Sequence, residues 1–555
     1  MYPNRVRSNL AVMLVAAAML LAACSGGASV DPGSAARGSD APAPAPAPAD
    51  PGPRGEISYG VVGDFNLLNP IFITAKTEDF VLSHLFSGLV RYSADLELEG
   101  ALAADWEFSD DALTWTFHLR EGVQWHDGHP FTAEDVRYTL ETLVDPDYGG
   151  PRASDFRNLD KVIVLDDHTV EIHLKEPFAP FLDALTIGIL PEHIFGDVPV
   201  AELRESPWNR APVGTGPYVF KEWREGQHVV LEAAPEFWDE GPYIKQVMVR
   251  IFQDNQVMLA ALEAGEITAL DAIPPDEIGR LQADLDASHN FYEHPANGYT
   301  YIGLKHTHPL FSDRRVRQAL MVGINRQQII DDVFSGYGIP VNSHYPPVAS
   351  VYHDRIDTYD YDPDRAADLL SEAGFSLQGG VLQNAAGEPF AFELVTGVGN
   401  PQMEDLLLAA RQQLLAVGVD MKVEPLEWSV LLSQYLDTGD FEAYALGWSL
   451  GLDPDAFIFF HSEAAEVGPD GFLSGLNDVS FRNAAVDELL EEGRRTLAPA
   501  ARQEIYGELH SLLNQELPYV FLYTQTIVGA IHNQVEDVVQ TPVGPAFRNL
   551  WRIAD

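Results

Sequence analysis

A serine between two glycines is the first candidate for chemistry in this sequence. Gly447-Trp448-Ser449-Leu450-Gly451 matches Gly-x-Ser-x-Gly, the turn that presents the nucleophile of many serine hydrolases. Such an enzyme also needs a helix directly after the serine, an oxyanion hole, and an acid and a histidine later in the chain. Leu452-Asp453-Pro454 delays any helix, and His461 follows Ser449 too closely for the usual arrangement. The stretch therefore favours a binding loop over a catalytic serine, and we expect no enzyme activity.

Composition indicates a large, acidic, globular protein. The 555 residues exceed what one hydrophobic core holds, so two or more domains are expected. Apolar residues make up 46% of the chain, and 34 basic against 83 acidic residues give a net charge of −49. A nucleic-acid-binding protein should be basic, so that class is disfavoured. The charge favours solubility, suits a salty medium and says little about a ligand.

The N-terminal residues have the pattern of an export signal. Leu10 to Ala22 is apolar, follows two arginines, and is too short for a transmembrane helix. Leu21-Ala22-Ala23-Cys24 resembles the bacterial lipobox, whose cysteine is lipid-modified, and Cys24 is the sole cysteine. We therefore expect a lipoprotein signal peptide at 1–23 and a Pro/Ala-rich tether at 24–55. The tether would hold the remaining chain outside the cell, anchored to the membrane by lipid (the periplasmic or outer face).

From Glu56 onward, strands and helices are mixed in an α/β pattern with βαβ character. The predicted strands include Thr169–Leu174, Phe390–Val395, Phe441–Leu446, Tyr519–Tyr523 and Thr526–Ile531. The predicted helices include Asn255–Ala264, Pro401–Ala416 and Trp428–Leu436. The candidate binding loop begins where the strand at Phe441–Leu446 is predicted to end.

Several short motifs occur in a fixed order between Glu56 and about Tyr523. They are Leu89–Tyr92, Leu102–Trp106, Leu119–Gly128, Phe131–Val136, Pro212–Tyr218, Phe311–Leu320, Gly447–Asp455 and Leu517-Pro518. Each motif alone is weak, but the ordered set closely resembles extracellular solute-binding protein family 5. The members of that family are the peptide- and nickel-binding components of ABC importers.

The resemblance implies a two-lobed periplasmic-binding-protein (Venus flytrap) fold of the cluster C type. Lobe I is expected at 56–98, 211–299 and 526–555, with an extra subdomain inserted at 99–210, and lobe II is expected at 300–525. Hinges are expected near Tyr299–Tyr301 and Leu522–Gln525. Ligand would bind between the lobes and stabilise a closed form that the ABC permease subunits recognise. A monomer without a cofactor is implied.

The resemblance also assigns residues to the ligand cleft. Trp448 and Trp428 correspond to aromatic residues that line the cleft in oligopeptide binders, and aromatic walls accept varied side chains. The main chain of Ser449, Leu450 and Gly451 is expected to contact the ligand, because an extended peptide can pair with the edge of such a segment.

Further residues are expected at the cleft lip and in structural turns. Phe65 and Asn66 follow the first strand and are expected to contact ligand from lobe I. Asp453-Pro454-Asp455 is predicted to be an Asx-type turn that starts a helix, so Asp453 and Asp455 are structural. Gly214 and Gly216 lie in a rigid turn that leads into a strand.

Two charged anchors of the dipeptide binders are absent. Those proteins carry an Asp shortly after the tryptophan and an Arg after the strand that matches Phe390–Val395. Here Leu450 and Gly451 occupy the first region, and Thr396–Pro401 contains no Arg. A buried peptide terminus without its counter-charge is costly, so the sequence predicts an oligopeptide ligand. An oligosaccharide or a nickel chelate in the same transport role is the alternative, and a serine hydrolase using Ser449 is a remote one.

The 17 histidines raise the question of a metal site. His126 and His129 are close in sequence, as are His306 and His308. His126 belongs to a turn that also occurs in family members without a metal. A metal held by protein side chains is therefore disfavoured.

Overall fold

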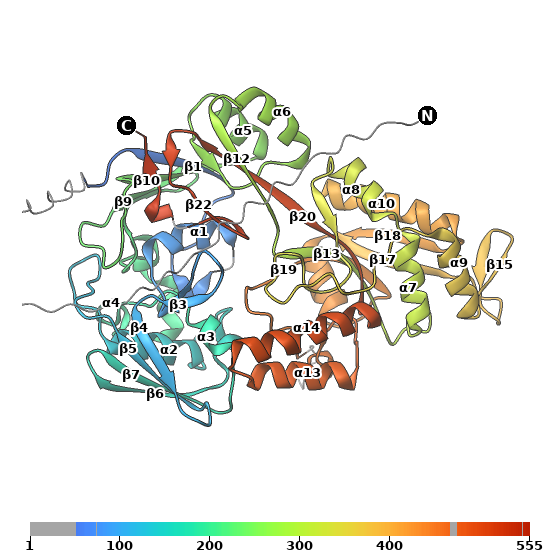
Figure 1. Ribbon diagram of the computed structural model, residues 1–555, viewed down its shortest axis with the longest axis horizontal. Coiled ribbons are helices and arrows are strands. Elements are labelled where there is room, and N and C mark those ends of the chain that lie inside the picture. The colour runs from blue at the N-terminus through green and yellow to red at the C-terminus, as the bar shows by residue number, and fades with distance from the viewer. Residues whose placement is uncertain (1–51, 74, 467–473, 547, 555) are drawn as a thin grey trace, which may run out of the picture. The chain divides into compact units, whose positions relative to one another are not determined.

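One mixed sheet of twelve strands runs through both main hydrophobic cores of the protein. The computed structural model describes residues 52–73, 75–466, 474–546 and 548–554. The sheet order is β18-β17-β19-β13-β20-β11-β1-β10-β9-β8, and β12 and β14 also pair with β20 (Figure 1). The predicted signal peptide, Cys24 and most of the tether lie outside the described residues. None of the helices in the described residues is long and apolar enough to cross a bilayer.

The first core is built on the half of the sheet that contains β1. Its main strands are β1 (Glu56–Val62), β8 (Tyr218–Arg224), β9 (His228–Ala233), β10 (Gln246–Phe252), β11 (Ala269–Leu270) and β12 (His289–Pro295). Helix α1 (Lys76–Leu85) packs in this core, whereas α5 (Asn255–Glu263) and α6 (Pro275–Leu285) form a third, smaller apolar cluster with β20. Two short hairpins close the chain, β21 (Val535–Glu536) with β24 (Arg552–Ile553) and β22 (Val539–Thr541) with β23 (Gly544–Ala546).

Residues between β1 and β8 add a separate antiparallel sheet to this core. Its order is β4-β5-β7-β6, and the chain enters it through the hairpin β2 (Val90–Tyr92) and β3 (Leu98–Gly100). Its elements are β4 (Ala103–Phe108), β5 (Thr114–Leu119), β6 (Leu159–Asp166), β7 (Thr169–Leu174), α2 (Ala133–Val144), α3 (Phe181–Ala184) and α4 (Glu192–Phe195). Alternate side chains of β5 (Trp115, Phe117 and Leu119) are buried, so its two-residue period places one face in the core. Its apolar cluster is continuous with that of the first core.

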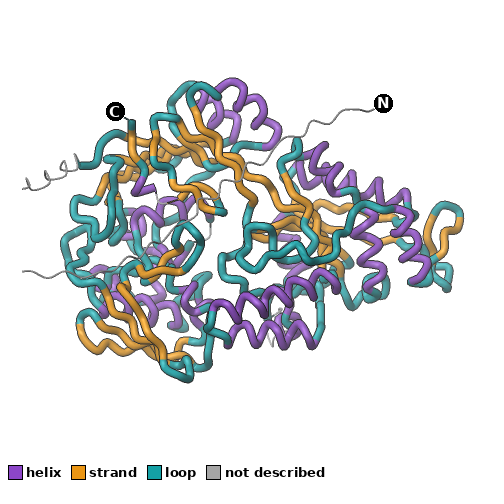
Figure 2. The backbone as a smooth tube through the Cα atoms, viewed as in Figure 1, coloured by secondary structure: helices purple, strands orange, loops and turns teal. Residues whose placement is uncertain are grey.

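The second core surrounds the other half of the sheet. Its strands are β13 (Gly298–Leu304), β14 (Gly338–Pro340), β17 (Ala391–Gly397), β18 (Asp420–Leu426) and β19 (Ala443–Ser449), with a hairpin of β15 (Ser376–Gln378) and β16 (Val381–Gln383). Its helices are α7 (Arg314–Gly323), α8 (Arg326–Val333), α9 (Pro363–Glu372), α10 (Pro401–Ala416), α11 (Trp428–Val430), α12 (Phe457–Phe460), α13 (Ala484–Arg495) and α14 (Pro499–Glu516). A π-helical turn, Leu431–Leu436, continues α11. Helices α13 and α14 pack side by side (Figure 2).

The helix starts follow local sequence signals. The side chain of Asn400 accepts a hydrogen bond from the Met403 N–H, and Pro401 fills the first turn of α10. Asp362 and Pro363 begin α9 in the same way. These starts satisfy main-chain donors that have no partner inside the helix.

A single long strand, β20 (Tyr519–His532), belongs to both cores. Its first part pairs with β13 and its second part with β12, so the prediction of two separate strands is wrong. The chain passes between the cores at Thr524-Gln525 and, before β13, at Ala296-Asn297. The crossing at Ala296-Asn297 lies before the predicted hinge at Tyr299–Tyr301, because Tyr299 and Tyr301 are both buried in the second core.

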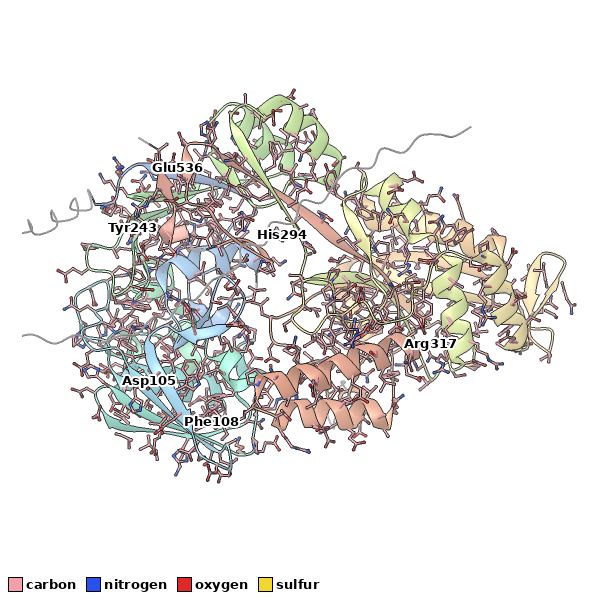
Figure 3. The ribbon with its side chains drawn as sticks, viewed as in Figure 1. Asp105, Phe108, Tyr243, His294, Arg317 and Glu536 are labelled. Carbon is pink, nitrogen blue, oxygen red and sulfur yellow. The ribbon has the colours of Figure 1, made fainter. Side chains whose placement is uncertain are left out.

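A buried arginine fixes the start of β20. Arg317, labelled in Figure 3, lies in α7. It donates to the carbonyl oxygens of Glu516 and Leu517 at 2.7 and 2.9 Å, and to those of Phe311 and Ser312 at 2.9 and 3.2 Å. The carbonyls of Glu516 and Leu517 lie at the C-terminus of α14 and have no partner within the helix. A cation is favoured at this end of a helix. Burial lowers the pKa of Arg317 to about 10, so the guanidinium stays charged at neutral pH.

Replacing Arg317 by Lys should destabilise the protein. An ammonium group cannot reach four carbonyls arranged around a planar guanidinium, so the free energy of unfolding should fall by about 2–3 kcal/mol. Urea unfolding followed by tryptophan fluorescence measures the change. Arg314→Lys is the matched control, because Arg314 is half exposed and pairs with the Glu516 side chain rather than with main-chain carbonyls. Equal stability of the two variants would contradict the capping role.

Candidate functional site

Strand β19 extends beyond its neighbour β17 and leaves part of one edge unpaired. β13 pairs with β19 along its whole length, whereas β17 pairs only with Ala443 and Tyr444. Within the described residues, the edge of β19 that faces away from β13 therefore has no strand partner from Leu446 to Ser449. An unpaired strand edge presents main-chain donors and acceptors in a regular row.

The extent of β19 corrects the prediction that the strand ends at Leu446 and a loop follows. The strand continues to Ser449 because β13 supplies partners as far as Gly298. Ser449 therefore lies inside a strand, and the next helix, α12, begins only at Phe457. This geometry is not the strand–turn–helix of a nucleophile elbow.

The alternation of hydrogen bonds along an antiparallel pair identifies which groups face the free edge. The Leu450 N–H donates to the Asn297 carbonyl at 2.8 Å, on the β13 side. Thr396 donates its hydroxyl to the Ala445 carbonyl at 3.0 Å, on the opposite side. Because successive residues point their main-chain groups to opposite edges, those of Gly447 and Ser449 face the free edge. Both residues are exposed.

A cavity of about 500 Å³ lies beside this edge. Its walls come from the end of β17 and the loop after it, from α10, from the segment 428–437, and from β19 itself. The lining is mainly apolar and includes Gly397, Met403, Trp428, Leu432, Trp448 and Leu476. A pocket with mostly apolar walls and few polar groups is typical of a ligand site.

The two predicted tryptophans line this cavity in different ways. Trp448 is half-buried, and its ring lies 5.7 Å from that of Tyr301 and 4.9 Å from that of Phe459. Trp428 is 52% exposed and lies over Gly397, where a Cβ would meet the indole at 3.1 Å. Trp448 is thus a fixed wall, and Trp428 has a free face.

The segment after β19 is held by a residue that the sequence analysis did not single out. The side-chain amide of Asn297 donates to the carbonyls of Leu450 and Gly451 at 3.2 and 2.8 Å. Gly451 is exposed, and no atom lies within 4 Å of where its Cβ would be. Because Asn297 lies at the crossing between the cores, the predicted contact residues are attached directly to that crossing.

Two arginines hold the turn that follows. Arg502 in α14 donates to both carboxylate oxygens of Asp453 at 2.5 and 2.7 Å. Arg494 in α13 donates to Asp455 Oδ2 at 2.9 and 2.7 Å. Burial alone would lower the pKa of Arg502, but the charge and hydrogen bonds of Asp453 outweigh it and raise the pKa. Both carboxylates are therefore neutralised by paired guanidinium groups.

The same turn has the Asx geometry that starts a helix. Asp453 accepts a hydrogen bond from the Asp455 N–H at 2.8 Å, and Asp455 accepts one from the Phe457 N–H at 3.2 Å. The second bond satisfies a main-chain donor at the start of α12. The two aspartates thus serve the turn and leave no free carboxylate for a ligand.

Arg494 also touches the inserted subdomain. Its carbonyl accepts a hydrogen bond from the Ala179 N–H at 2.7 Å, and its guanidinium lies 5.4 Å from the ring of Phe178 and 3.7 Å from that of Phe457. The pKa of Asp183, in α3, is raised to about 6 by burial and by the charge of Asp453. The turn after β19 is thus linked to the inserted subdomain by direct contacts and by the effect of its charge on the pKa of Asp183.

Phe65 is buried, so its side chain offers little surface to a ligand, and its predicted ligand contact stays a prediction. Its ring is only 5% exposed and meets Trp223 edge-on at 6.1 Å within the first core. Asn66 is exposed, but its main-chain and side-chain N–H groups both donate to Glu78 at 3.1 Å. Neither residue lines the cavity beside β19.

The turn with Gly214 and Gly216 packs directly against the end of α1. A Cβ at Gly214 would lie 1.8 Å from the Leu85 carbonyl oxygen, and one at Gly216 would lie 2.5 Å from that of His84. The Gly214 N–H donates to His126 Nδ1 at 3.1 Å, so the proton is on Nε2, which bonds the Gly216 carbonyl at 2.9 Å. Only glycine fits at these positions.

Two of the histidines considered as metal ligands, His126 and His306, form hydrogen bonds to the main chain. Burial lowers the pKa of His126, so its ring is neutral while both nitrogens are engaged. Burial lowers that of His306 to about 3, and its Nε2 bonds the Pro518 carbonyl at 3.0 Å. The described residues contain no group of three or more side chains suited to hold a metal ion.

Lobe I carries a second cavity, of about 460 Å³, that the sequence did not predict. Arg91 and Tyr92 line it together with Trp238. Arg91 bonds Glu99 at 2.8 Å and Asp239 at 2.5 Å, which fixes the polar wall. The motif Leu89–Tyr92 was the part of the sequence that could have indicated this cavity. Its residues come together with Trp238 only in the folded chain.

Comparisons with known proteins agree with this architecture. The family model for bacterial extracellular solute-binding proteins, family 5 (middle), matches residues 97–466. The oligopeptide-binding protein AppA of Bacillus subtilis is 31% identical over 92% of both chains. Its structure with a nonapeptide superposes with a TM-score of 0.74, covering 91% of this chain and all of AppA.

Relatives with other ligands are similar to nearly the same degree. The glutathione-binding protein GsiB of Salmonella typhimurium is 26% identical, over 86% of this chain and 90% of GsiB. The structure of NikZ from Campylobacter jejuni with Ni(L-His) has a TM-score of 0.74 at 25% identity, covering 90% of this chain and all of NikZ. Similarity to these relatives therefore does not distinguish between their classes of ligand.

Removing one guanidinium from the turn should destabilise the second core. Arg494→Gln leaves the Asp455 carboxylate buried without its counter-charge, so the free energy of unfolding should fall by about 3 kcal/mol. Arg495→Gln is the adjacent control, because Arg495 is exposed and should cost under about 0.5 kcal/mol. Chemical denaturation measures both. A loss for Arg494→Gln no larger than that of the control would show that the pair does not hold the turn.

Proposed function

Because the chain belongs to family 5 of the bacterial extracellular solute-binding proteins, which serve ABC transporters and are not enzymes, we propose that its ligands are oligopeptides. The site would bind a peptide between the lobes and deliver it to the permease. The proposal rests on one observation above all, the unpaired edge of β19 beside an aromatic cavity.

Main-chain pairing with β19 would explain binding that tolerates many sequences. The N–H and C=O groups of Gly447 and Ser449 face the free edge and are exposed. An extended peptide offers complementary groups at every second residue, and pairing of this kind does not depend on side-chain identity. The cavity walls of Trp428 and Trp448 would then accept the side chains of the peptide.

The charges around the site support a peptide longer than two residues. The first acidic residue after Trp448 is Asp453, and its carboxylate is already paired with Arg502. The loop Thr396–Pro401, at the other end of the cavity, contains no Arg. Neither position offers a free counter-charge for a peptide terminus, so a dipeptide would bury at least one terminus unpaired.

A ligand screen followed by one pair of variants tests the proposal. Di- to nonapeptides, oligosaccharides and nickel chelates are compared by thermal shift, because a ligand that binds only the folded state raises the melting temperature. Peptides of four or more residues should give the shift. Stabilisation by sugars or nickel chelates alone would replace the peptide with the other ligand class.

The Ser449→Pro variant should weaken peptide binding about tenfold, because it removes an N–H that faces the free edge while leaving the pairing with β13 intact. Ser449→Ala is the control, because it keeps the N–H and removes only the hydroxyl. Its dissociation constant, measured by isothermal titration calorimetry, should stay within about twofold of the original value. Equal affinity of the two variants would contradict strand pairing at β19.

We infer that Cys24 carries the lipid that anchors the protein outside the cell. The lipobox-like Leu21–Cys24 and the Ala-Pro repeat after it support this placement. In a bacterial host, Cys24→Ala should move the protein from the membrane fraction to the soluble fraction and abolish its labelling by an alkyne fatty acid. Ser25→Ala should leave both unchanged. Membrane retention and labelling of Cys24→Ala would refute the anchor.

A further inference from the structure

The cavity beside β19 contains a buried carboxylate that lacks a close counter-charge. Asp478 is 7% exposed and lines the cavity together with Trp448 and Leu476. Its carboxylate accepts one hydrogen bond, from the Tyr444 hydroxyl at a long 3.4 Å. Among the residues that the structure describes, Asp478 forms no ion pair, which requires a cationic nitrogen within 4.0 Å. A buried charge is normally paired, so this one is unusual.

Lys305, a cation near Asp478, bonds the main chain instead of the carboxylate. Lys305 donates its Nζ to the main-chain carbonyl of Asp478 at 3.1 Å and lies 4.8 Å from the ring of Phe441. Asp453 and Asp455, by contrast, each have a bidentate arginine. Asp453 and Asp455 are therefore closely paired, whereas Asp478 is only partly compensated.

The groups around Asp478 come from four elements. Lys305 follows β13, Tyr444 lies on β19, Tyr519 on β20, and Asp437 at the end of the segment 428–437. Burial raises the pKa of Asp478 to about 7, helped by Asp437 and opposed by Lys305 and Tyr444. Asp437 also lines the cavity and lies near Asp478, and among the described residues that line it these are the two acids and none is a cation.

The remaining walls suit a long side chain with an apolar stem. They include Met403, Trp428, Leu432, Leu436 and Leu476. Arginine and lysine bury their methylene groups along such surfaces while the charged end reaches a polar partner, and a guanidinium also stacks on an aromatic face.

The position of the cavity relative to β19 connects it with a bound peptide. Tyr444, Leu446 and Trp448 alternate along β19 and therefore lie on one face of the sheet. Tyr444 contacts Asp478, and Leu446 and Trp448 line the cavity, so the cavity opens on that face. Every second side chain of a peptide paired with Gly447 and Ser449 would point to the same face.

We propose that this cavity is a pocket for an arginine or lysine side chain of the bound peptide, with Asp478 as the counter-charge. The inference rests on the proposed function and specifies the peptides that it favours. A cation in the pocket forms a charge-assisted hydrogen bond in a site shielded from water, where such a bond is strong. The net charge of −49 adds long-range attraction for the same peptides.

Matched peptides test the pocket. A pentaalanine series carries one arginine at each position in turn, and a second series carries citrulline, the uncharged isostere, at the same positions. Calorimetry on the full mature chain should find at least one position where arginine binds about tenfold tighter than citrulline. Asp478→Asn should remove this preference and leave the citrulline affinity within about twofold. Asp405→Asn, an exposed acid on α10, should keep the preference.

The dependence on pH gives an independent readout. The cation requires the ionised form of Asp478, which predominates above a pKa of about 7. The preference for arginine should therefore increase from pH 6 to pH 8 in the unaltered protein and stay flat in Asp478→Asn.

Other outcomes overturn the proposal in distinguishable ways. Equal affinity for arginine and citrulline at every position contradicts the pocket but leaves peptide binding intact. If Asp478→Asn binds neither the arginine peptides nor the citrulline peptides and its melting temperature is also lowered, Asp478 has a structural role instead. Failure of every peptide to bind the unaltered protein overturns the proposed function and the pocket together.

Discussion

The overhang of β19 beyond β17 is the constraint on which the site depends. β13 pairs with the whole of β19, and the pairing of β17 with β19 ends at Tyr444, so one short edge in the middle of the sheet stays open. The cavity, its two tryptophans and Asp478 all border that edge. An open edge is normally an aggregation hazard. Here it is only a few residues long, and the net charge of −49 opposes association of two chains.

The three aspartates around the cavity and the turn after β19 are held in two ways. Asp453 and Asp455 are held by arginines from α14 and α13, and this double pairing makes the segment after β19 rigid. Asp478 has a long hydrogen bond and no close cation. The contrast separates acids that stabilise the fold from one that is available to a ligand. Ion pairs of the first kind cost desolvation and are worth most when the geometry is bidentate.

The predicted contact residues are attached to both cores at once. Asn297, at the crossing into β13, holds Leu450 and Gly451, and Arg494 joins the next turn to the inserted subdomain. β20 continues through both cores without a break. A ligand on β19 would therefore bear on the residues that connect the cores, which is what the family's two-lobed mechanism requires.

Much of the architecture follows from local sequence. Thr169–Leu174 is a strand with the predicted bounds, Asn400-Pro401 starts α10, and Asp453-Pro454-Asp455 forms an Asx turn. Hydrophobic periodicity, helix caps and turn residues each depend on a few neighbouring positions, so they can be predicted from the sequence. The ordered motifs likewise identified the family, and with it the fold.

Tertiary structure alone decided which edge stays open and which charges meet. Phe65 follows the first strand as predicted, yet its ring is buried against Trp223, a residue far away in the sequence. Two predicted strands merge into β20 because β13 and β12 pair with its successive halves. The partners of Asp453 and Asp478 come from α14 and β19. Pairing of strands and burial of charge depend on residues brought together from distant parts of the chain, and no local pattern encodes them.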